Sequence, residues 1–188
     1  MIKGAHSVIR SADPDDAGAL KSVYDSQTPR SSLLDQRREL NPPTRDELRE
    51  VMSQKEMGKA VFYTVEGRDG EICGFCCLRG LNPEAQFSEF VVIFLDETTF
   101  STAMADEVFD FLSRLAFERM RNHKVVTHCL DSETEYRKFL ISHGFESAGV
   151  QRDVVFSQGR WFNLEALTLR AADCTFADRR ATDRGAIC

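Results

Sequence analysis

The chain contains 188 residues, of which 42% are hydrophobic and 29% are charged, and its formal net charge is −6. These values are typical of one soluble domain with its own core, and they exclude a disordered body. The acidic balance argues against a nucleic-acid partner, because such proteins present a basic face. The apolar runs are far too short to span a bilayer and the first residues contain no signal-peptide core, so we expect a cytoplasmic protein without membrane contact.

The N-terminal third predicts one strand and two helices. Residues 6–10 contain the apolar pair of a first strand. Asp13 is placed to cap a first helix, and residues 44–47 form a capping box that opens a second helix. We expect Gly58 to end that second helix.

Three strands follow as an antiparallel meander. They are predicted over residues 60–65, 72–78 and 87–95, with a hairpin turn at residues 68–70. The third strand contains an unbroken β-branched and aromatic run over residues 90–95. Such a run is typical of a strand that is buried on both faces.

A strand-turn-helix unit stands at the centre of the chain. A long helix is predicted over residues 103–120, and a strand over residues 124–130. The helix acts as a crossover, which places the strand at residues 124–130 parallel to the strand that contains residues 90–95. The turn at residues 96–102 aims free backbone N–H groups at one point, which is a site for an anion. An ordinary α/β connection is the alternative, since this turn contains no glycine.

The C-terminal part predicts one helix and one hairpin. Residues 132–135 form another capping box, in which Ser132 is the helix cap. The helix ends at Gly144, and strands over residues 150–156 and 161–169 follow it. The exposed hairpin is a candidate edge for a homodimer.

The chain shows no internal repeat and no linker that divides its body. From residue 172 onward it is polar and patternless. We therefore expect one domain over residues 1–171 and a disordered tail over residues 172–188.

The six cysteines do not predict a metal site or a disulfide framework. Cys73 and Cys76 have a zinc-like spacing, but no second pair stands at a matching distance. Both lie in a predicted strand, whose alternation points them to opposite faces. Buried cysteine acting as a small hydrophobe is the stronger interpretation.

Four local phrases stand in order along the chain. They are Ile72-Cys73-Gly74-Phe75, Leu115–Arg119 with His123–Val125, His143–Glu146 with Gly149-Val150, and Phe156–Trp161. With the order of the elements, they resemble the GNAT superfamily of acyl-CoA N-acyltransferases, and the last phrase resembles its ribosomal-protein-acetyltransferase-like branch. The resemblance covers roughly residues 7–170.

The resemblance implies an α/β fold with a mixed, mostly antiparallel central sheet and helices on both faces. It implies transfer of an acetyl or other acyl group from coenzyme A to a primary amine by direct attack. The acceptor would be a small molecule or a protein N-terminus, and the co-substrate would be acetyl-CoA or another acyl-CoA.

The resemblance also implies where the coenzyme binds. In the family, the acyl-pantetheine pairs with the exposed fourth-strand backbone, where one N–H holds the oxyanion. The corresponding residues are Val91, Val92, Ile93, Phe94 and Leu95. The phosphates would lie on the N–H groups of Ser101, Thr102, Ala103, Met104 and Ala105.

Three side chains are candidates for catalysis. Glu89 opens the fourth strand, where carboxylates act as the base in some relatives; a solvated strand-end charge is the alternative. His128 carries a side chain that titrates near neutral pH, with a hydrogen-bonded sheet histidine as the alternative. Tyr136 is the candidate acid, with a core tyrosine as the alternative.

The sequence also departs from the family pattern. Phe100 and Ala103 stand where the family has Gln or Arg and Gly, Glu133 where it often has Asn, and Leu140 where it often has Tyr. A GNAT-fold binding or regulatory module that has lost catalysis is therefore the alternative function. A weaker alternative is acyl transfer to a hydroxyl.

Overall fold

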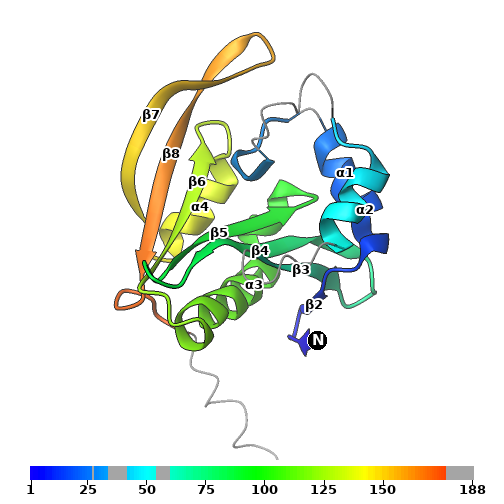
Figure 1. Cartoon of the computed structure of the whole chain (residues 1–188), viewed down its shortest axis with the longest axis horizontal. Coiled ribbons are helices and arrows are strands. Elements are labelled where there is room, and N and C mark those ends of the chain that lie inside the picture. The colour runs from blue at the N-terminus through cyan, green and yellow to red at the C-terminus, as the bar shows by residue number, and fades with distance from the viewer. Residues whose placement is uncertain (27, 34–41, 54–59, 177–188) are drawn as a thin grey trace, which may run out of the picture.

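The computed structural model, shown in Figure 1, describes residues 1–26, 28–33, 42–53 and 60–176. Eight strands form one sheet in the order β1-β2-β3-β4-β5-β6-β8-β7. The strands are β1 (Ile2–Lys3), β2 (Ser7–Ser11), β3 (Ala60–Gly67), β4 (Ile72–Asn82), β5 (Phe87–Phe94), β6 (Lys124–Leu130), β7 (Glu146–Ser157) and β8 (Arg160–Arg170). The helices and helical turns are η1 (Pro14–Asp16), α1 (Ala17–Asp25), η2 (Ser31–Leu33), α2 (Arg45–Ser53), η3 (Glu97–Ser101), α3 (Ala103–Arg114), η4 (Leu115–Arg119) and α4 (Thr134–Ser142).

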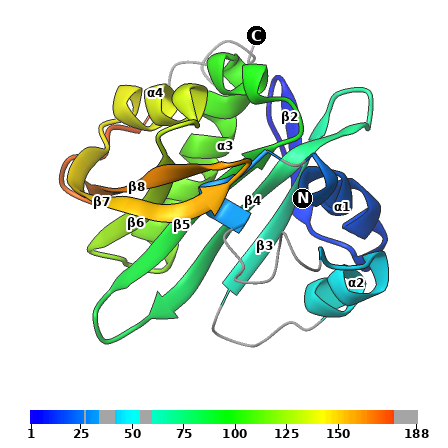
Figure 2. The same ribbon diagram turned by 90° about the horizontal axis from the view of Figure 1, so that it is seen from above.

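Helices cover both faces of the sheet, as the α/β prediction requires. Figure 2 shows α3 and α4 on one face and α1 and α2 on the other. The larger core cluster lies beneath α3 and α4, and it includes Phe90, Val108 and Leu140. Smaller clusters lie beneath α1 and α2, around Val91 and Phe75. The predicted fold class is confirmed.

The helix starts on the N-terminal side follow from their capping residues. The Asp13 side chain accepts from the Asp15 N–H, but the first turn is the 3₁₀ turn η1, so α1 begins only at Ala17. Before α2, the Thr44 N–H donates to Glu47 Oε2 at 2.7 Å and the Glu47 N–H donates to Thr44 Oγ1 at 3.2 Å, which is the predicted capping box. The predicted end of this helix, Gly58, lies outside the described residues.

The meander of β3, β4 and β5 is antiparallel as predicted. Gly74 allows β5 to approach β4 closely, because a Cβ at this position would collide with the carbonyl oxygen of Ile93. This close approach explains why a glycine stands within the Ile72–Phe75 motif.

The predicted helix over residues 103–120 is divided into two parts. α3 ends at Arg114, and η4 continues as a π-helical turn in which the Met120 N–H donates to the Leu115 carbonyl. β6 then runs parallel to β5, as the crossover predicted. The parallel pairing covers only Phe87–Glu89 against Lys124–Val126, so the two strands separate beyond that point.

The capping box predicted at residues 132–135 is wrong. α4 begins at Thr134, and neither Ser132 nor Glu133 caps it with its side chain. The Ser132 hydroxyl is buried without a hydrogen-bond partner among the described residues. The Glu133 carboxylate accepts from the backbone N–H groups of Ser31 and Leu130 instead. The Glu133 carboxylate thus pairs with unpaired backbone N–H groups of neighbouring segments and does not cap α4.

The C-terminal hairpin of β7 and β8 forms one edge of the sheet, as Figure 1 shows. Trp161 is 57% exposed and packs on Phe156, whereas its neighbour Phe162 is buried. Of the predicted disordered tail, residues 172–176 are described, and the ring of Phe176 lies beneath the Arg114 guanidinium. Residues 177–188 lie outside the described part of the chain.

Side chains alternate between the two faces of β4 at Cys76 and Cys77, whereas the predicted opposition of Cys73 and Cys76 crosses the register shift between Ile72 and Gly74 and stays a prediction. Cys76 faces the cluster beneath α3 and Cys77 the cluster beneath α1. All cysteines among the described residues are free, and these residues contain no group of side chains that fits a metal. None of the helices in the described ranges has both the length and the apolarity needed to cross a bilayer.

Candidate active site

The separation of β5 from β6 leaves strand backbone without a strand partner. The Leu95 N–H donates to the Cys73 carbonyl of β4 at 2.9 Å. Because hydrogen-bonding direction alternates along an antiparallel strand, Val91 and Ile93 also turn their backbone groups toward β4. Val92 and Phe94 turn theirs toward β6. Of the five β5 positions predicted to pair with pantetheine, these two face the opening between the strands, which we call the wedge.

At the wide end of the wedge, side chains satisfy the open backbone groups. Arg30 Nη1 donates to the Phe94 carbonyl at 2.8 Å. Ser31 Oγ donates to the His128 carbonyl at 2.7 Å. The Leu130 N–H donates to Glu133 Oε2 at 2.8 Å. Both strands can therefore end apart without leaving these backbone groups unpaired.

Glu89 lies on the α1 side of the wedge, where it is held by two cations. Arg79 Nε and Nη2 donate to its two carboxylate oxygens at 2.6 and 2.9 Å. Its Oε1 also lies 3.4 Å from His128 Nδ1. Burial raises the pKa of Glu89, but the hydrogen bonds to His128 and Arg79 outweigh it and lower the pKa to about 2. The carboxylate is therefore charged at neutral pH and a weak base.

His128 is 34% exposed and comes from the β6 end of the wedge. If Nδ1 carries the proton and donates to Glu89, Nε2 keeps a lone pair that can accept a proton. The structure thus brings two of the predicted catalytic side chains together on one side of the sheet.

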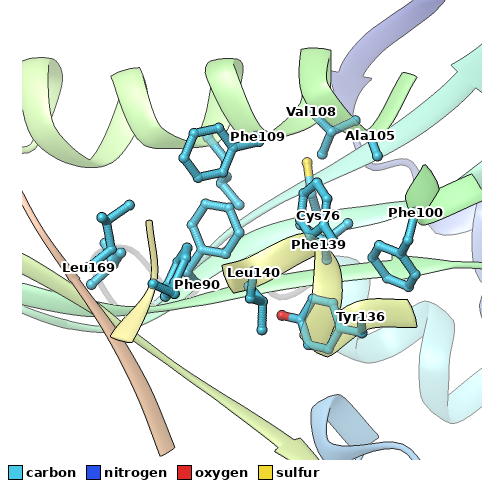
Figure 3. Close-up of a cluster of buried hydrophobic side chains, with 14 of the residues drawn as sticks. Cys76, Phe90, Phe100, Ala105, Val108, Phe109, Tyr136, Phe139, Leu140 and Leu169 are labelled. Carbon is cyan, nitrogen blue, oxygen red and sulfur yellow. The ribbon is translucent and has the colours of Figure 1, made fainter. Parts of the chain in front are cut away.

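Tyr136 lies on the opposite side of the wedge, in the core beneath α3 and α4. Figure 3 shows it beside Phe100, Phe139 and Leu140. Its hydroxyl lies 2.9 Å from Thr127 Oγ1 and also accepts from the Val92 N–H. Burial raises the pKa of this phenol far above its usual value, so it stays protonated.

The turn between β5 and α3 presents backbone to solvent. Ser101, Thr102 and Ala103 are exposed at the start of α3, where the first helical N–H groups have no acceptor within the helix. The Ser101 and Thr102 hydroxyls donate back to carbonyls of η3, so they do not cap α3. Phe100, at the family position for Gln or Arg, is buried against Phe94 and Tyr136.

A carboxylate also stands in the first turn of α3. Asp106 Oδ1 lies 3.2 Å from Nε2 of His143, which packs on the Phe109 and Phe139 rings. A carboxylate at this position opposes the binding of a second anion to the same helix end.

Cys129 offers no nucleophile. It is buried, and its thiol contacts the carbonyls of Leu130 and Glu133. Burial, followed by the nearby carboxylates of Glu133 and Glu165, raises the pKa of this thiol well above its usual value.

Sequence reasoning missed Arg79, Thr127, Arg30 and Ser31. Arg79 is opposite Glu89 in the β4–β5 register, so a correct register for that hairpin would have paired them. Thr127 directly precedes His128, but no sequence motif marks it as a functional residue. Arg30 and Ser31 lie in a polar stretch of sequence without periodicity, so no pattern pointed to their contacts.

Comparison with known proteins shows the family and the fold. A family model for the acetyltransferase (GNAT) domain matches residues 9–164. No curated protein sequence matches the chain.

Similar solved structures include a spermidine N-acetyltransferase from Vibrio cholerae in complex with CoA and spermine. It has a TM-score of 0.77 at 16% identity, over 90% of this chain and 98% of that chain. The dodecameric spermidine N-acetyltransferase from Vibrio cholerae in an intermediate state has a TM-score of 0.72 at 17% identity, over 89% of this chain and 95% of that chain. At such identities the likeness shows the fold.

Proposed function

The chain belongs to the GNAT acetyltransferase family, and from that premise we propose that it acetylates the primary amine of a small cationic molecule. The family assignment makes it an acyl-CoA-dependent N-acyltransferase with acyl-CoA as co-substrate. The observation that carries the proposal is the contact between Glu89 and His128, fixed by Arg79, beside the wedge.

The coenzyme binds along β5 in this proposal. Its pantetheine arm pairs with the wedge-facing backbone of Val92 and Phe94, sharing the Val92 N–H with Tyr136 and the Phe94 carbonyl with Arg30. The phosphates lie at the turn Ser101 to Ala105, whose first three residues are exposed; the N–H groups of Ala103 and Met104 at the start of α3 are the donors, since those of Thr102 and Ala105 donate to the carbonyls of Thr99 and Thr102. Alanine at 103 makes the approach less close than glycine does, but it keeps the N–H donors.

His128 is the general base in this proposal, and Glu89 orients it. Glu89 is too weak a base to take a proton from an ammonium group, since its pKa is about 2. It is suited instead to hold the imidazole through Nδ1, so that Nε2 accepts the proton of the amine, directly or through water.

The amine nitrogen then attacks the thioester carbon, and the carbonyl oxygen becomes an oxyanion that the Val92 N–H stabilises. The adduct nitrogen loses its second proton to solvent, and the intermediate collapses by breaking the carbon–sulfur bond, which gives the neutral amide and the coenzyme A thiolate. Tyr136 keeps its proton and donates a hydrogen bond to the departing sulfur. The proton on His128 leaves to solvent, and the thiolate is protonated from solvent.

The acceptor class rests on charge and on the matched structures. The net charge of −6 favours a cationic amine. The similar structures are named for spermidine acetylation, and one contains spermine. We place the reaction in the cytoplasm, which agrees with the free cysteines of the described residues.

The test is a titration followed by an acceptor panel. Calorimetric titration with acetyl-CoA should give micromolar binding, about −8 kcal/mol. Release of free thiol is then measured with spermidine, spermine, short peptides with free N-termini and amino alcohols blocked at nitrogen. Turnover with the polyamines supports the proposal, whereas turnover only with peptides changes the acceptor. Binding without turnover, or no binding, returns the protein to the alternative of a module without catalysis.

A further inference from the structure

The segment Arg30–Ser32 connects the two strands that separate. Its contacts reach β5 through the Arg30 guanidinium and β6 through the Ser31 hydroxyl. Arg30 and Ser31 are 7% and 4% exposed, so both contacts are shielded from water. We call this segment the bridge.

The bridge is also fixed from the start of α4. Glu133 Oε2 accepts from the Ser31 N–H at 3.0 Å and from the Leu130 N–H at 2.8 Å. One buried carboxylate oxygen therefore ties the bridge to β6 two residues beyond His128. Burial raises the pKa of Glu133, yet a carboxylate or a neutral amide oxygen can accept both bonds.

The bridge reaches the catalytic pair by a second route. Arg79, whose Nε and Nη2 hold Glu89, donates through Nη1 to the Ser32 carbonyl at 3.2 Å. Glu89 in turn contacts the His128 imidazole. The contacts form a closed ring: His128 side chain, Glu89, Arg79, the bridge, and back to the His128 carbonyl.

We propose that Ser31, held by Glu133, is a positioning residue for His128, because it fixes the backbone of the residue whose ring Glu89 and Arg79 hold from the other side. The bridge then sets the distance and angle at which Nε2 meets the amine. This inference rests on the proposed role of His128 as base.

The experiment compares four variants with the wild-type full chain. Ser31→Ala removes the bond to the His128 carbonyl, and Ser132→Ala is the matched control, since it removes a buried hydroxyl that has no partner among the described residues. Glu133→Ala removes the acceptor of the bridge, and Glu133→Gln keeps an acceptor oxygen in its place. Turnover, acetyl-CoA affinity, melting temperature and the nitrogen-15 NMR signals of the His128 ring are measured for each.

For Ser31→Ala and Glu133→Ala, we expect kcat to fall about tenfold with little change in acetyl-CoA affinity, because the base is displaced and the coenzyme site is not. The Nδ1-protonated form of His128 should lose population in both. Ser132→Ala and Glu133→Gln should retain wild-type turnover and ring signals.

The inference is overturned if Ser31→Ala behaves like Ser132→Ala, or if it lowers the melting temperature and leaves kcat and the ring signals unchanged. The NMR signals do not depend on activity. If the wild-type protein fails to turn over any amine, unchanged ring signals in Ser31→Ala overturn the positioning role, and changed signals support it while the proposed function fails by itself.

Discussion

Arg79 and Glu89 face each other across β4 and β5, joined by two hydrogen bonds of 2.6 and 2.9 Å. This pair makes Glu89 an anchor with a firmly held negative charge, and it leaves the imidazole of His128 as the better proton acceptor at the wedge. The predictions below separate these two roles.

Substitution Glu89→Gln should lower kcat about 10- to 100-fold at neutral pH, because His128 loses the carboxylate that orients it. Acetyl-CoA affinity should stay within about twofold, since Glu89 lies away from the turn proposed for the phosphates. Steady-state kinetics and calorimetry check both. Full activity in this variant would remove Glu89 from the mechanism.

The acid stability of the protein should depend on the same residue. The pKa of Glu89 is lowered from an ordinary 4.5 to about 2, so its stabilisation is complete above about pH 4.5 and is lost as the pH falls toward 2. The contribution is on the order of 3 kcal/mol at neutral pH. Urea unfolding between pH 2 and pH 6 should show a smaller acid loss in Glu89→Gln than in the wild type. Parallel curves would contradict the prediction.

Substitution His128→Gln should lower kcat/KM by a factor of about 10² to 10⁴ while the coenzyme still binds. Steady-state kinetics with the acceptor well below its KM check this. If the variant keeps the wild-type kcat/KM, water or the amine itself supplies the proton transfer.

Substitution Tyr136→Phe tests the other side of the wedge. Loss of the hydroxyl removes the bond to Thr127, and we expect a destabilisation of about 1 kcal/mol. We also expect kcat to fall about tenfold, because the departing sulfur loses a hydrogen-bond donor. A stability loss with unchanged kcat would leave Tyr136 as a core residue only.

Substitution Ala103→Glu should abolish measurable acetyl-CoA binding with the fold retained, because it adds negative charge and bulk at the proposed phosphate site. Ser22→Glu is the matched control, since Ser22 is an exposed helical residue on the opposite face. Calorimetry and circular dichroism give both readouts. Unchanged affinity in Ala103→Glu would disprove the assignment of the turn. The converse change, Asp106→Asn, should tighten binding about two- to fivefold by removing a like charge.

Much of the fold follows from the sequence alone. The meander, the parallel placement of β6 and the stop of α4 just before Gly144, which has a positive φ, follow from apolar runs, capping residues and a crossover helix, which are local signals. The false capping box at Ser132 shows where local signals fail. The open N–H of Leu130 attracts the Glu133 carboxylate, and no sequence pattern reveals that competition.

The site is less predictable than the fold for the same reason. Glu89 and His128 could be named one at a time, but their contact depends on how far β5 and β6 separate. Predicting the role of Arg79 requires the register of the β4–β5 hairpin. The role of Ser31 could not be predicted, because it lies in a polar stretch with no periodicity. The ring around His128 is therefore a product of tertiary structure.

The short parallel pairing of β5 with β6 has a mechanical consequence. The sheet is nearly two sheets, β1 to β5 and β6 to β8, that share strand pairing over only three residue pairs. A coenzyme paired with Val92 and Phe94 supplies the strand that the fold lacks at this place. Binding of the coenzyme should therefore slow hydrogen exchange at the backbone of both halves of the sheet. Each release of coenzyme A then removes a group that joins the two halves.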